Sequence, residues 1–112
     1  MSDCIFCKII TGEIPSKKVY EDENVFAFHD INPAADTHVL VIPKKHIASL
    51  NELTEQDEEL MGKFMLSIPK VAKLLGLKGF KTVFNTGKEG GQMVFHIHAH
   101  ILGGKIKLKL PE

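Results

Sequence analysis

The most regular pattern of hydrophobic and polar residues in the chain is the alternating segment His96-Ile97-His98-Ala99-His100-Ile101-Leu102. A period of two is typical of a half-buried β-strand and not of a helix. On such a strand the three histidines share one face, while the isoleucines and the alanine between them face a core. The pattern therefore predicts a strand that places three imidazoles side by side.

Four further segments have the β-branched and apolar content of strands. They cover residues 19–21, 25–29, 37–42 and 80–85. The polar residues 22–24 between the first two predict a hairpin. Residues 30–36, which contain Asn32-Pro33, and the glycine-rich residues 87–91 predict loops.

Two segments have the features of helices. Residues 4–10 are compact and apolar, with Asp3 as the expected N-cap and Gly12 after the end. A longer helix is expected to begin at the N-cap Thr54, and Pro69 is expected to kink it or to end its first part. Its apolar stripe, which predicts a core-facing side, consists of Met61, Phe64, Met65, Ile68, Val71 and Leu75.

Together these elements predict one α+β domain over residues 1–112. We expect a roughly five-stranded antiparallel meander with one long and one short helix. A chain of 112 residues is long enough to bury a core without disulfides.

Charge and composition narrow the function classes. All 14 basic residues are lysine and they balance 14 acidic residues, so the formal net charge is zero. Because arginine is the usual reader of guanine, its absence argues against sequence-specific nucleic-acid binding. No stretch approaches the roughly 18 apolar residues of a membrane span, and the polar start lacks the pattern of a signal peptide. We therefore expect a cytoplasmic protein with no membrane and no nucleic-acid partner.

The histidine segment is the strongest candidate for chemistry, because neutral imidazole is a nucleophile and a proton carrier near neutral pH. His98 lies between the two other imidazoles and is the natural nucleophile. His38 begins an apolar strand and either lies beside this strand or is a satisfied strand-end histidine. The glycine loop before the strand can offer backbone N–H groups to a phosphate, with Asn85 and Gln92 as neutral donors at its ends.

The N-terminal Cys4-Ile5-Phe6-Cys7 places two thiols at the spacing of a zinc half-site. A single Cys-x-x-Cys motif can also be a redox pair or a coincidence, although the flanking pattern of a thioredoxin-like site is missing. His46 and His96 are available as two further ligands. A structural zinc site would join the N-terminal helix to the sheet.

The segment from His96 to Leu102 resembles the motif of the histidine triad family, His-φ-His-φ-His-φ-φ with φ hydrophobic. The similarity extends over nearly the whole chain and is to the nucleotide-binding (Hint) branch. Its further matching segments are residues 4–10, Ile14-Pro15, residues 19–22, residues 27–31, residues 38–46 and Asn85-Thr86-Gly87.

The resemblance implies an α+β homodimer whose two sheets join and which binds purine nucleoside monophosphates such as AMP and GMP. It implies hydrolysis of nucleoside 5′-phosphoramidates, with His98 attacking the α-phosphorus to form a nucleotidyl-histidine intermediate. His100 would contact the phosphate and assist proton transfer, and His38 would orient His98.

The resemblance also implies binding residues. Those for the nucleotide would be Phe6, Ile9, Phe28, Asp30, Ile31, Asn85, Gly91, Gln92, Met93, His98 and His100, with Asp30 on the ribose hydroxyls. Some bacterial-type members hold zinc with the equivalents of Cys4, Cys7, His46 and His96, and all four are present.

Two departures from the family pattern bear on the substrate. Met93 occupies a position that is often serine, and residues 105–112 lack a tryptophan-bearing tail. Met93 is the only sequence support for one alternative, a nucleotide-binding adaptor with weak catalysis. Two others also stay open: a dinucleoside polyphosphate hydrolase, and a zinc hydrolase that uses all three triad histidines as ligands.

Overall fold

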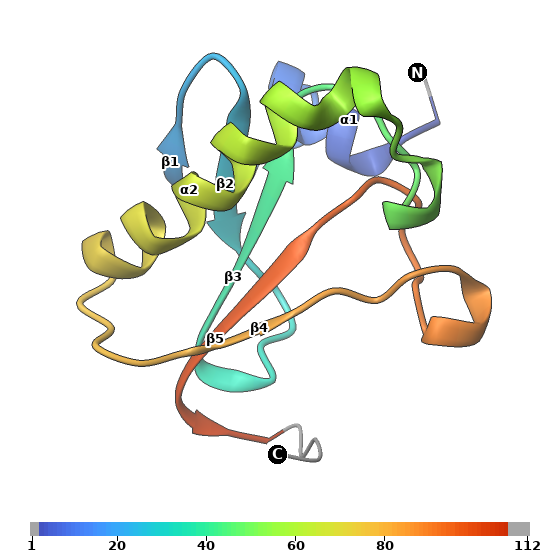
Figure 1. The fold of residues 1–112 in the computed structure, drawn as a ribbon. Helices are drawn as coiled ribbons and strands as arrows, with labels where there is room; N and C mark the ends of the chain where they lie inside the picture. The colour runs from blue at the N-terminus through green and yellow to red at the C-terminus, as the bar shows by residue number, and fades with distance from the viewer. Residues whose placement is uncertain (1–2, 108–112) are drawn as a thin grey trace.

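The computed structural model describes residues 3–107 and shows a five-stranded antiparallel sheet with two helices (Figure 1). The elements are α1 (Ile5–Thr11), β1 (Lys18–Glu21), β2 (Val25–His29), β3 (Ala35–Pro43), α2 (Glu58–Leu74), β4 (Lys81–Val83) and β5 (Ala99–Ile106). Short 3₁₀ turns cover Leu50–Glu52, Glu55–Asp57 and Lys88–Gly90. The predicted α+β class, sheet and pair of helices are confirmed.

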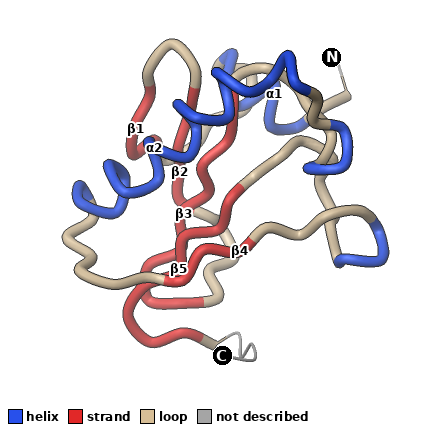
Figure 2. Tube along the Cα trace, in the orientation of Figure 1, coloured by secondary structure: helices blue, strands red, loops and turns tan. Residues whose placement is uncertain are grey.

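The strand order is β1-β2-β3-β5-β4, so the predicted meander is wrong. After β3 the chain forms α2 and returns as β4 at the far edge, and β5 then fills the place between them (Figure 2). The physical reason is burial, since Val39 and Val41 of β3 and Ala99 and Ile101 of β5 are fully buried. β3 and β5 pair in the interior of the sheet, which places His38 directly opposite Leu102.

Alternation along β3 divides the core between the two faces of the sheet. Val39 and Val41 belong to the cluster that α2 covers with Phe64, Ile68 and Val71. Leu40 and Ile42 belong to a second cluster with Phe6 and Ile9 of α1, and with Phe26 and Phe28 of β2. The long helix and the short helix therefore cover opposite faces, and the site described below lies on the face of the short helix.

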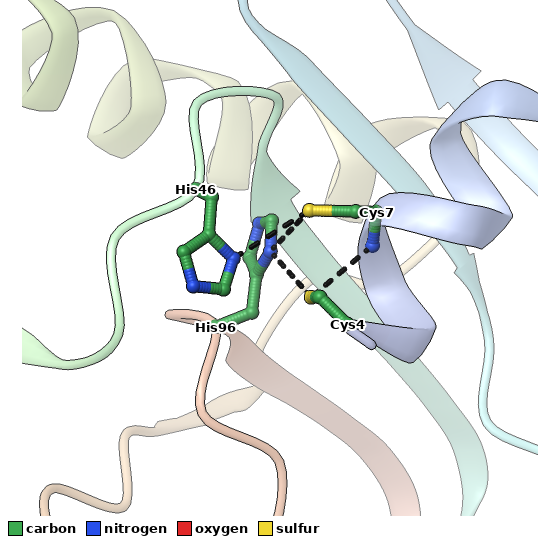
Figure 3. Close-up of side chains that lie close together, drawn as sticks. All are labelled: Cys4, Cys7, His46 and His96. Carbon is green, nitrogen blue, oxygen red and sulfur yellow. Dashed lines mark hydrogen bonds between the residues drawn. The ribbon is translucent and has the colours of Figure 1, made fainter. Parts of the chain in front are cut away.

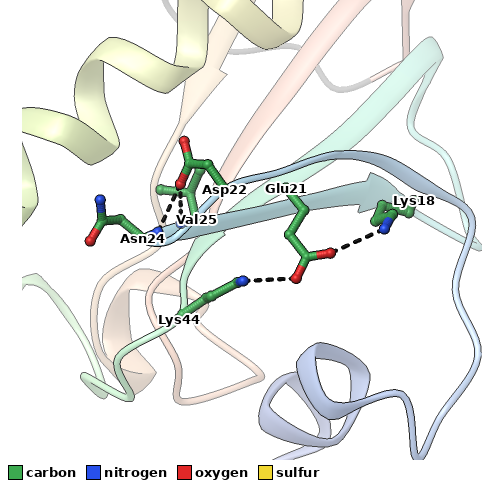
Figure 4. Close-up of polar contacts among 6 residues, drawn as sticks. All are labelled: Lys18, Glu21, Asp22, Asn24, Val25 and Lys44. Atoms are coloured by element: carbon green, nitrogen blue, oxygen red, sulfur yellow. Dashed lines mark hydrogen bonds and ion pairs between the residues drawn. The ribbon is translucent and has the colours of Figure 1, made fainter.

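The hairpin predicted around residues 22–24 is confirmed, and its turn is held by Asp22. The Asp22 carboxylate accepts backbone N–H bonds from Asn24 at 2.8 Å and from Val25 at 3.0 Å (Figure 4). Glu21 lies between two ammonium groups, at 2.7 Å from Lys44 and 3.0 Å from Lys18. These two hydrogen-bonded lysines lower the pKa of Glu21, Lys44 contributing most. The hairpin is thus tied to the end of β3.

The histidine segment enters the sheet later than predicted. The strand begins at Ala99 and continues to Ile106, so His96 and His98 precede it. The reason is a competing partner, because the Ile97 N–H donates to the Ile47 carbonyl at 2.8 Å in the loop after β3. The predicted core-facing side is confirmed, since Ile97, Ala99 and Ile101 belong to the cluster covered by α2, but the prediction of a half-buried segment is wrong, because His96 and His98 are buried as well.

Several element ends also differ from the predictions. The N-cap of α1 is Cys4, whose sulfur accepts the Cys7 N–H at 3.3 Å, and not Asp3. Thr54 caps a 3₁₀ turn ahead of α2, and α2 continues through Pro69 without ending there. β3 begins at Ala35, inside the predicted loop, and β4 is limited to Lys81–Val83. Gly12 ends α1 in the left-handed conformation, as predicted.

The C-terminal segment 105–112 is only partly described. Lys105 and Ile106 belong to the end of β5, and the predictions for residues 108–112 lie outside the described residues. Within residues 3–107, neither helix has the length and apolar content that crossing a bilayer requires.

Gly104 gives a test of the sheet's end. It has a φ of +73°, and a Cβ added there would lie 2.7 Å from the Asp36 carboxylate oxygen that accepts the Lys105 N–H. We expect Gly104→Ala to lower the free energy of unfolding by about 1–3 kcal/mol, measured by urea denaturation. Gly79→Ala is the matched control, because a Cβ added at Gly79 would meet no non-neighbouring atom within 4 Å and its φ is not positive. Equal urea-denaturation midpoints for the two variants would contradict the expectation.

Candidate active site and metal centre

His98 lies in a cavity with one ring nitrogen fixed by the backbone. Its Nδ1 is 2.8 Å from the carbonyl oxygen of His96. A carbonyl only accepts, so Nδ1 carries the proton and Nε2 keeps its lone pair. Burial lowers the pKa of His98, which holds the ring neutral. The fold thus leaves Nε2 of His98 unprotonated and able to accept a proton or attack an electrophile.

A second pair of histidines has its tautomers fixed in the same way. The Ala34 N–H donates to His38 Nδ1 at 2.9 Å, so the proton of His38 is on Nε2. That Nε2 lies 2.9 Å from His100 Nδ1 and donates to it. His100 therefore carries its own proton on Nε2, and its ring centroid is 4.9 Å from that of His98. A lone pair on His98 and an N–H donor on His100 occur side by side.

Burial also lowers the pKa of both members of this pair. The pKa of His100 falls to about 4, mainly through desolvation and further through His98 and His38. The pKa of His38 is lowered by burial, against the opposing effect of the Asp30 carboxylate, which lies 3.5 Å from Nε2. Near neutral pH the imidazoles are therefore uncharged.

The cavity beside His98 has a volume of about 540 Å³ and a lining of mixed chemistry. Apolar side chains come from α1 and β2, among them Phe6, Ile9 and Phe28, and the Phe6 ring centroid lies 5.1 Å from that of His98. Polar side chains also line the cavity. Of the predicted nucleotide-binding set, the lining includes Phe6, Ile9, Phe28, Asp30, Ile31, Asn85, Gly91, Met93, His98 and His100.

Cys4, Cys7, His46 and His96 converge at the N-terminus of α1 (Figure 3). His96 Nδ1 lies 3.3 Å from Cys4 Sγ and 3.6 Å from Cys7 Sγ, and His46 Nδ1 lies 3.5 Å from Cys7 Sγ. Zinc bonds of about 2.0–2.3 Å place neighbouring ligand atoms of a tetrahedron about 3.3–3.8 Å apart. Three of the six ligand pairs therefore have the spacing of a tetrahedral site, and all four ligand atoms lie within 4.8 Å of one another.

The tautomer of His96 also fits a metal. Its Nε2 donates to the Pro43 carbonyl at 2.7 Å, which leaves a lone pair on Nδ1 facing the sulfurs. Burial and the Cys4 side chain raise the pKa of the Cys7 thiol to about 11, whereas a bound cation would favour the thiolate. The donor set suits a cation that prefers nitrogen and sulfur ligands.

Comparisons with known proteins place the chain in a family. The model of the HIT domain matches residues 11–107. The chain belongs to the HIT family. Protein HitA of Neisseria gonorrhoeae is 55% identical over 104 residues, covering 92% of this chain and 97% of that protein.

Solved structures of other HIT proteins superpose closely on this one. A HIT family hydrolase from Legionella pneumophila has a TM-score of 0.88 and 50% identity, covering 92% of this chain and 94% of its own. A histidine triad protein from Clostridium difficile has a TM-score of 0.90 and 49% identity, covering 100% of this chain and 96% of its own. The family resemblance found in the sequence is thereby confirmed, and the Hint branch stays a prediction.

Gln92 of this HIT protein has a different setting from the one predicted. Its Oε1 accepts the Gly87 N–H at 2.8 Å, and its Nε2 donates to Ala48 at 2.7 Å and to Val94 at 3.0 Å. The side chain is buried and is not among the cavity-lining residues. The Gln92 side chain therefore stabilises the glycine loop from its buried side. The Asn85 side chain donates a hydrogen bond to the Gly90 carbonyl of the same loop.

The sequence prediction also omitted several cavity residues. Ile5, Ile14, Leu40 and Val94 line the cavity. Leu40 could have been found, because it lies two residues after His38 on the same strand and so shares its face. Ile5 lies on α1, Ile14 follows α1 and Val94 precedes β5, so no strand periodicity links them to the histidines.

A second cluster of possible ligands, Asp30, His38 and His100, occurs in the HIT cavity. It is unsuited to a metal, because the Ala34 N–H occupies His38 Nδ1 and so forces the proton onto Nε2, the nitrogen that would have to bind. Nor do the three triad histidines converge on one point: within residues 3–107, His96 groups with the cysteines and His98 with neither cluster. A zinc hydrolase with all three as ligands therefore gains no support from this geometry.

The lowered pKa values predict acid sensitivity. His38 and His100 bind protons less readily in the folded protein than in the unfolded chain, so stability is complete above pH about 6.5 and falls toward pH 4. With allowance for solvent screening, we expect His100 to account for about 1–2 kcal/mol of the loss at pH 5. Urea unfolding between pH 7.5 and 4.5 should show a shallower pH dependence for His100→Asn. The same dependence of the unfolding free energy on pH in variant and wild type would contradict this assignment.

Proposed function

We propose that this HIT protein is a hydrolase of purine nucleoside 5′-phosphoramidates that acts through a covalent nucleotidyl intermediate on His98. The observation that carries the proposal is the fixed tautomer of His98, whose Nε2 lone pair faces a cavity of nucleotide size. The similarity to a HIT family hydrolase from Legionella pneumophila supports the reaction class.

In the proposed reaction, His98 Nε2 attacks the α-phosphorus and the phosphorus–nitrogen bond breaks. The bonding electron pair leaves with the amine, which takes up a proton. The Nε2–H of His100 donates to the phosphoryl group and assists that proton transfer, while His38 keeps His100 in the required tautomer. Water then attacks the phosphorus, and the bond between phosphorus and Nε2 breaks with its electron pair returning to His98. The water gives up a proton and the nucleoside monophosphate is released.

The cavity offers apolar side chains for the base of a nucleotide and polar groups for its ribose and phosphate. A purine base would pack between the apolar side chains Phe6, Ile9 and Phe28, beside Ile31. Asp30 would accept hydrogen bonds from the ribose hydroxyls. Asn85, Gly91 and the backbone near Met93 would face the phosphate from the glycine loop.

The four-residue cluster at α1 is proposed to hold a structural zinc ion through Cys4, Cys7, His46 and His96. The ion would supply no step of the reaction; it would fix α1 and the backbone of His96, whose carbonyl orients His98.

A homodimer is also proposed, because α2 exposes Met65, Leu66 and Leu74. Sedimentation equilibrium at twice the chain mass tests the dimer.

A dinucleoside polyphosphate hydrolase would use the same nucleophile, but the charges in the cavity favour the smaller leaving group. Among the described residues that line it, none is lysine, and Asp30 adds a negative charge. A polyphosphate leaving group would carry several negative charges with no cation to receive them.

The test is a comparison of two substrates under the same conditions. We expect kcat/KM for adenosine 5′-phosphoramidate to exceed that for diadenosine tetraphosphate by at least about a hundredfold. The reverse order would make the polyphosphate the better substrate. Absence of turnover with both, together with tight AMP binding, would instead favour the nucleotide-binding adaptor.

A further inference from the structure

A second hollow adjoins the active-site cavity. It has a volume of about 470 Å³ and is lined by Asp3, Cys4, Ile5, His46, Met93, Val94 and Phe95. Ile5, Met93 and Val94 also line the cavity that contains His98. The two spaces therefore meet along these three side chains, and a ligand that fills the first can extend into the second.

The second hollow has a mixed lining, in which three large hydrophobic side chains are exposed beside the polar groups of Asp3, Cys4 and His46. Met93 is 89% exposed, Ile5 45% and Phe95 46%, although all three are large hydrophobic side chains. Contiguous exposed apolar side chains of this kind mark binding surfaces. Met93 adds a flexible thioether that adapts to ligands of different shape.

The charges around the second hollow favour one sign of ligand. Asp3 is acidic, and the described residues that line the hollow include no lysine. A carboxylate or phosphate placed here would meet no lysine side chain among the described lining residues and would be repelled by Asp3. An ammonium group would be attracted.

We propose that the second hollow binds the amine portion of the substrate. This inference rests on the proposed phosphoramidate hydrolysis and specifies its leaving group: an amine with an aromatic or alkyl body, with a cationic end favoured and a carboxylate disfavoured. With the nucleotide in the first cavity and phosphorus beside His98, the amine body extends over Met93 and packs against Ile5 and Phe95. Phe95 and Asp3 are then determinants of specificity.

The experiment compares two substrates that differ only in the amine. Adenosine 5′-phosphoramidate has no amine body, and the N-phenethyl derivative has an aromatic one. We expect Phe95→Ala to lower kcat/KM for the phenethyl substrate about tenfold and to leave the unsubstituted substrate within twofold. Phe95 lines only the second hollow, so the reaction chemistry should be unaffected.

Phe80→Ala is the matched control, since Phe80 is 37% exposed and lines neither space. Phe80→Ala should leave kcat/KM unchanged for both substrates.

A second pair of derivatives, with an aminoethyl or a carboxymethyl group on nitrogen, tests Asp3. Asp3→Asn should reduce the preference for the aminoethyl form by about threefold or more.

The outcomes separate the two proposals. An unchanged substrate ratio in Phe95→Ala, with normal turnover of the unsubstituted substrate, would overturn the amine subsite and leave the hydrolase proposal standing. A change in oligomeric state of Phe95→Ala would also overturn the amine subsite, because it would show that the hollow is an interface between copies of the chain. Absence of turnover of every phosphoramidate by wild type would overturn the proposed function itself.

Discussion

Replacing His98 by alanine is expected to lower kcat for adenosine 5′-phosphoramidate by at least about a thousandfold. The variant removes the Nε2 lone pair that would attack phosphorus, and neither of the other two triad imidazoles is free to take its place. His96 Nδ1 faces two sulfurs, and His100 Nδ1 is occupied by His38. AMP binding should weaken only severalfold, because the apolar side chains that line the cavity are unchanged.

Intact-mass spectrometry after rapid quench provides the direct measurement. Wild type should show a transient adduct of one AMP mass, and His98→Ala should show none. His100→Ala should retain the adduct while turning over more slowly, because it keeps the nucleophile and loses the Nε2–H donor. Turnover without any adduct would point to direct attack by water.

His98→Gln separates the nucleophile from the packing. Its amide can still donate to the His96 carbonyl, but it offers no nucleophilic nitrogen. We expect the same loss of turnover as in the alanine variant with a smaller change in thermal stability. Substantial activity in either variant would show that His98 is not the nucleophile.

Replacing both cysteines by serine is expected to abolish zinc binding and to lower the melting temperature by more than about 10 °C. Wild type should contain about one zinc per chain by elemental mass spectrometry. The expected cost is large because the cluster joins α1 to the loop after β3 and to His96, three segments distant in sequence.

Serine is the informative substitution because its hydroxyl can still cap α1. The Cys4 sulfur accepts the Cys7 N–H, and a serine oxygen can accept the same bond, so loss of the cap is largely removed from the comparison. His98→Ala is the control that keeps all four ligands and should keep its zinc. Full metal occupancy in the Cys4→Ser, Cys7→Ser double variant would overturn the assignment of the site.

Part of this protein could be predicted from local sequence alone. The alternation of His96 to Leu102 predicted which side chains enter the core, and Ile97, Ala99 and Ile101 are indeed buried. Gly12 predicted the end of α1, and residues 22–24 predicted the hairpin. These features depend on neighbours in the chain, through backbone conformation and side-chain periodicity, so a sequence pattern is enough to specify them.

Other features depended on contacts between distant segments. The strand order follows from the mutual burial of β3 and β5, and the late start of β5 follows from the bond between Ile97 and Ile47. Gln92 had the residue type of a phosphate donor, yet its amide is used by the backbone of its own loop and of Ala48. No periodicity records such bonds.

The sequence by itself determined the family and supplied the histidines and cysteines, because residue identity fixes which chemistry is available. Only the tertiary structure decided the tautomer of each imidazole. The carbonyl of His96, the amide of Ala34 and the carbonyl of Pro43 assign the protons of His98, His38 and His96. A ring nitrogen takes its role as donor or acceptor from the group that faces it, and folding brings those groups together.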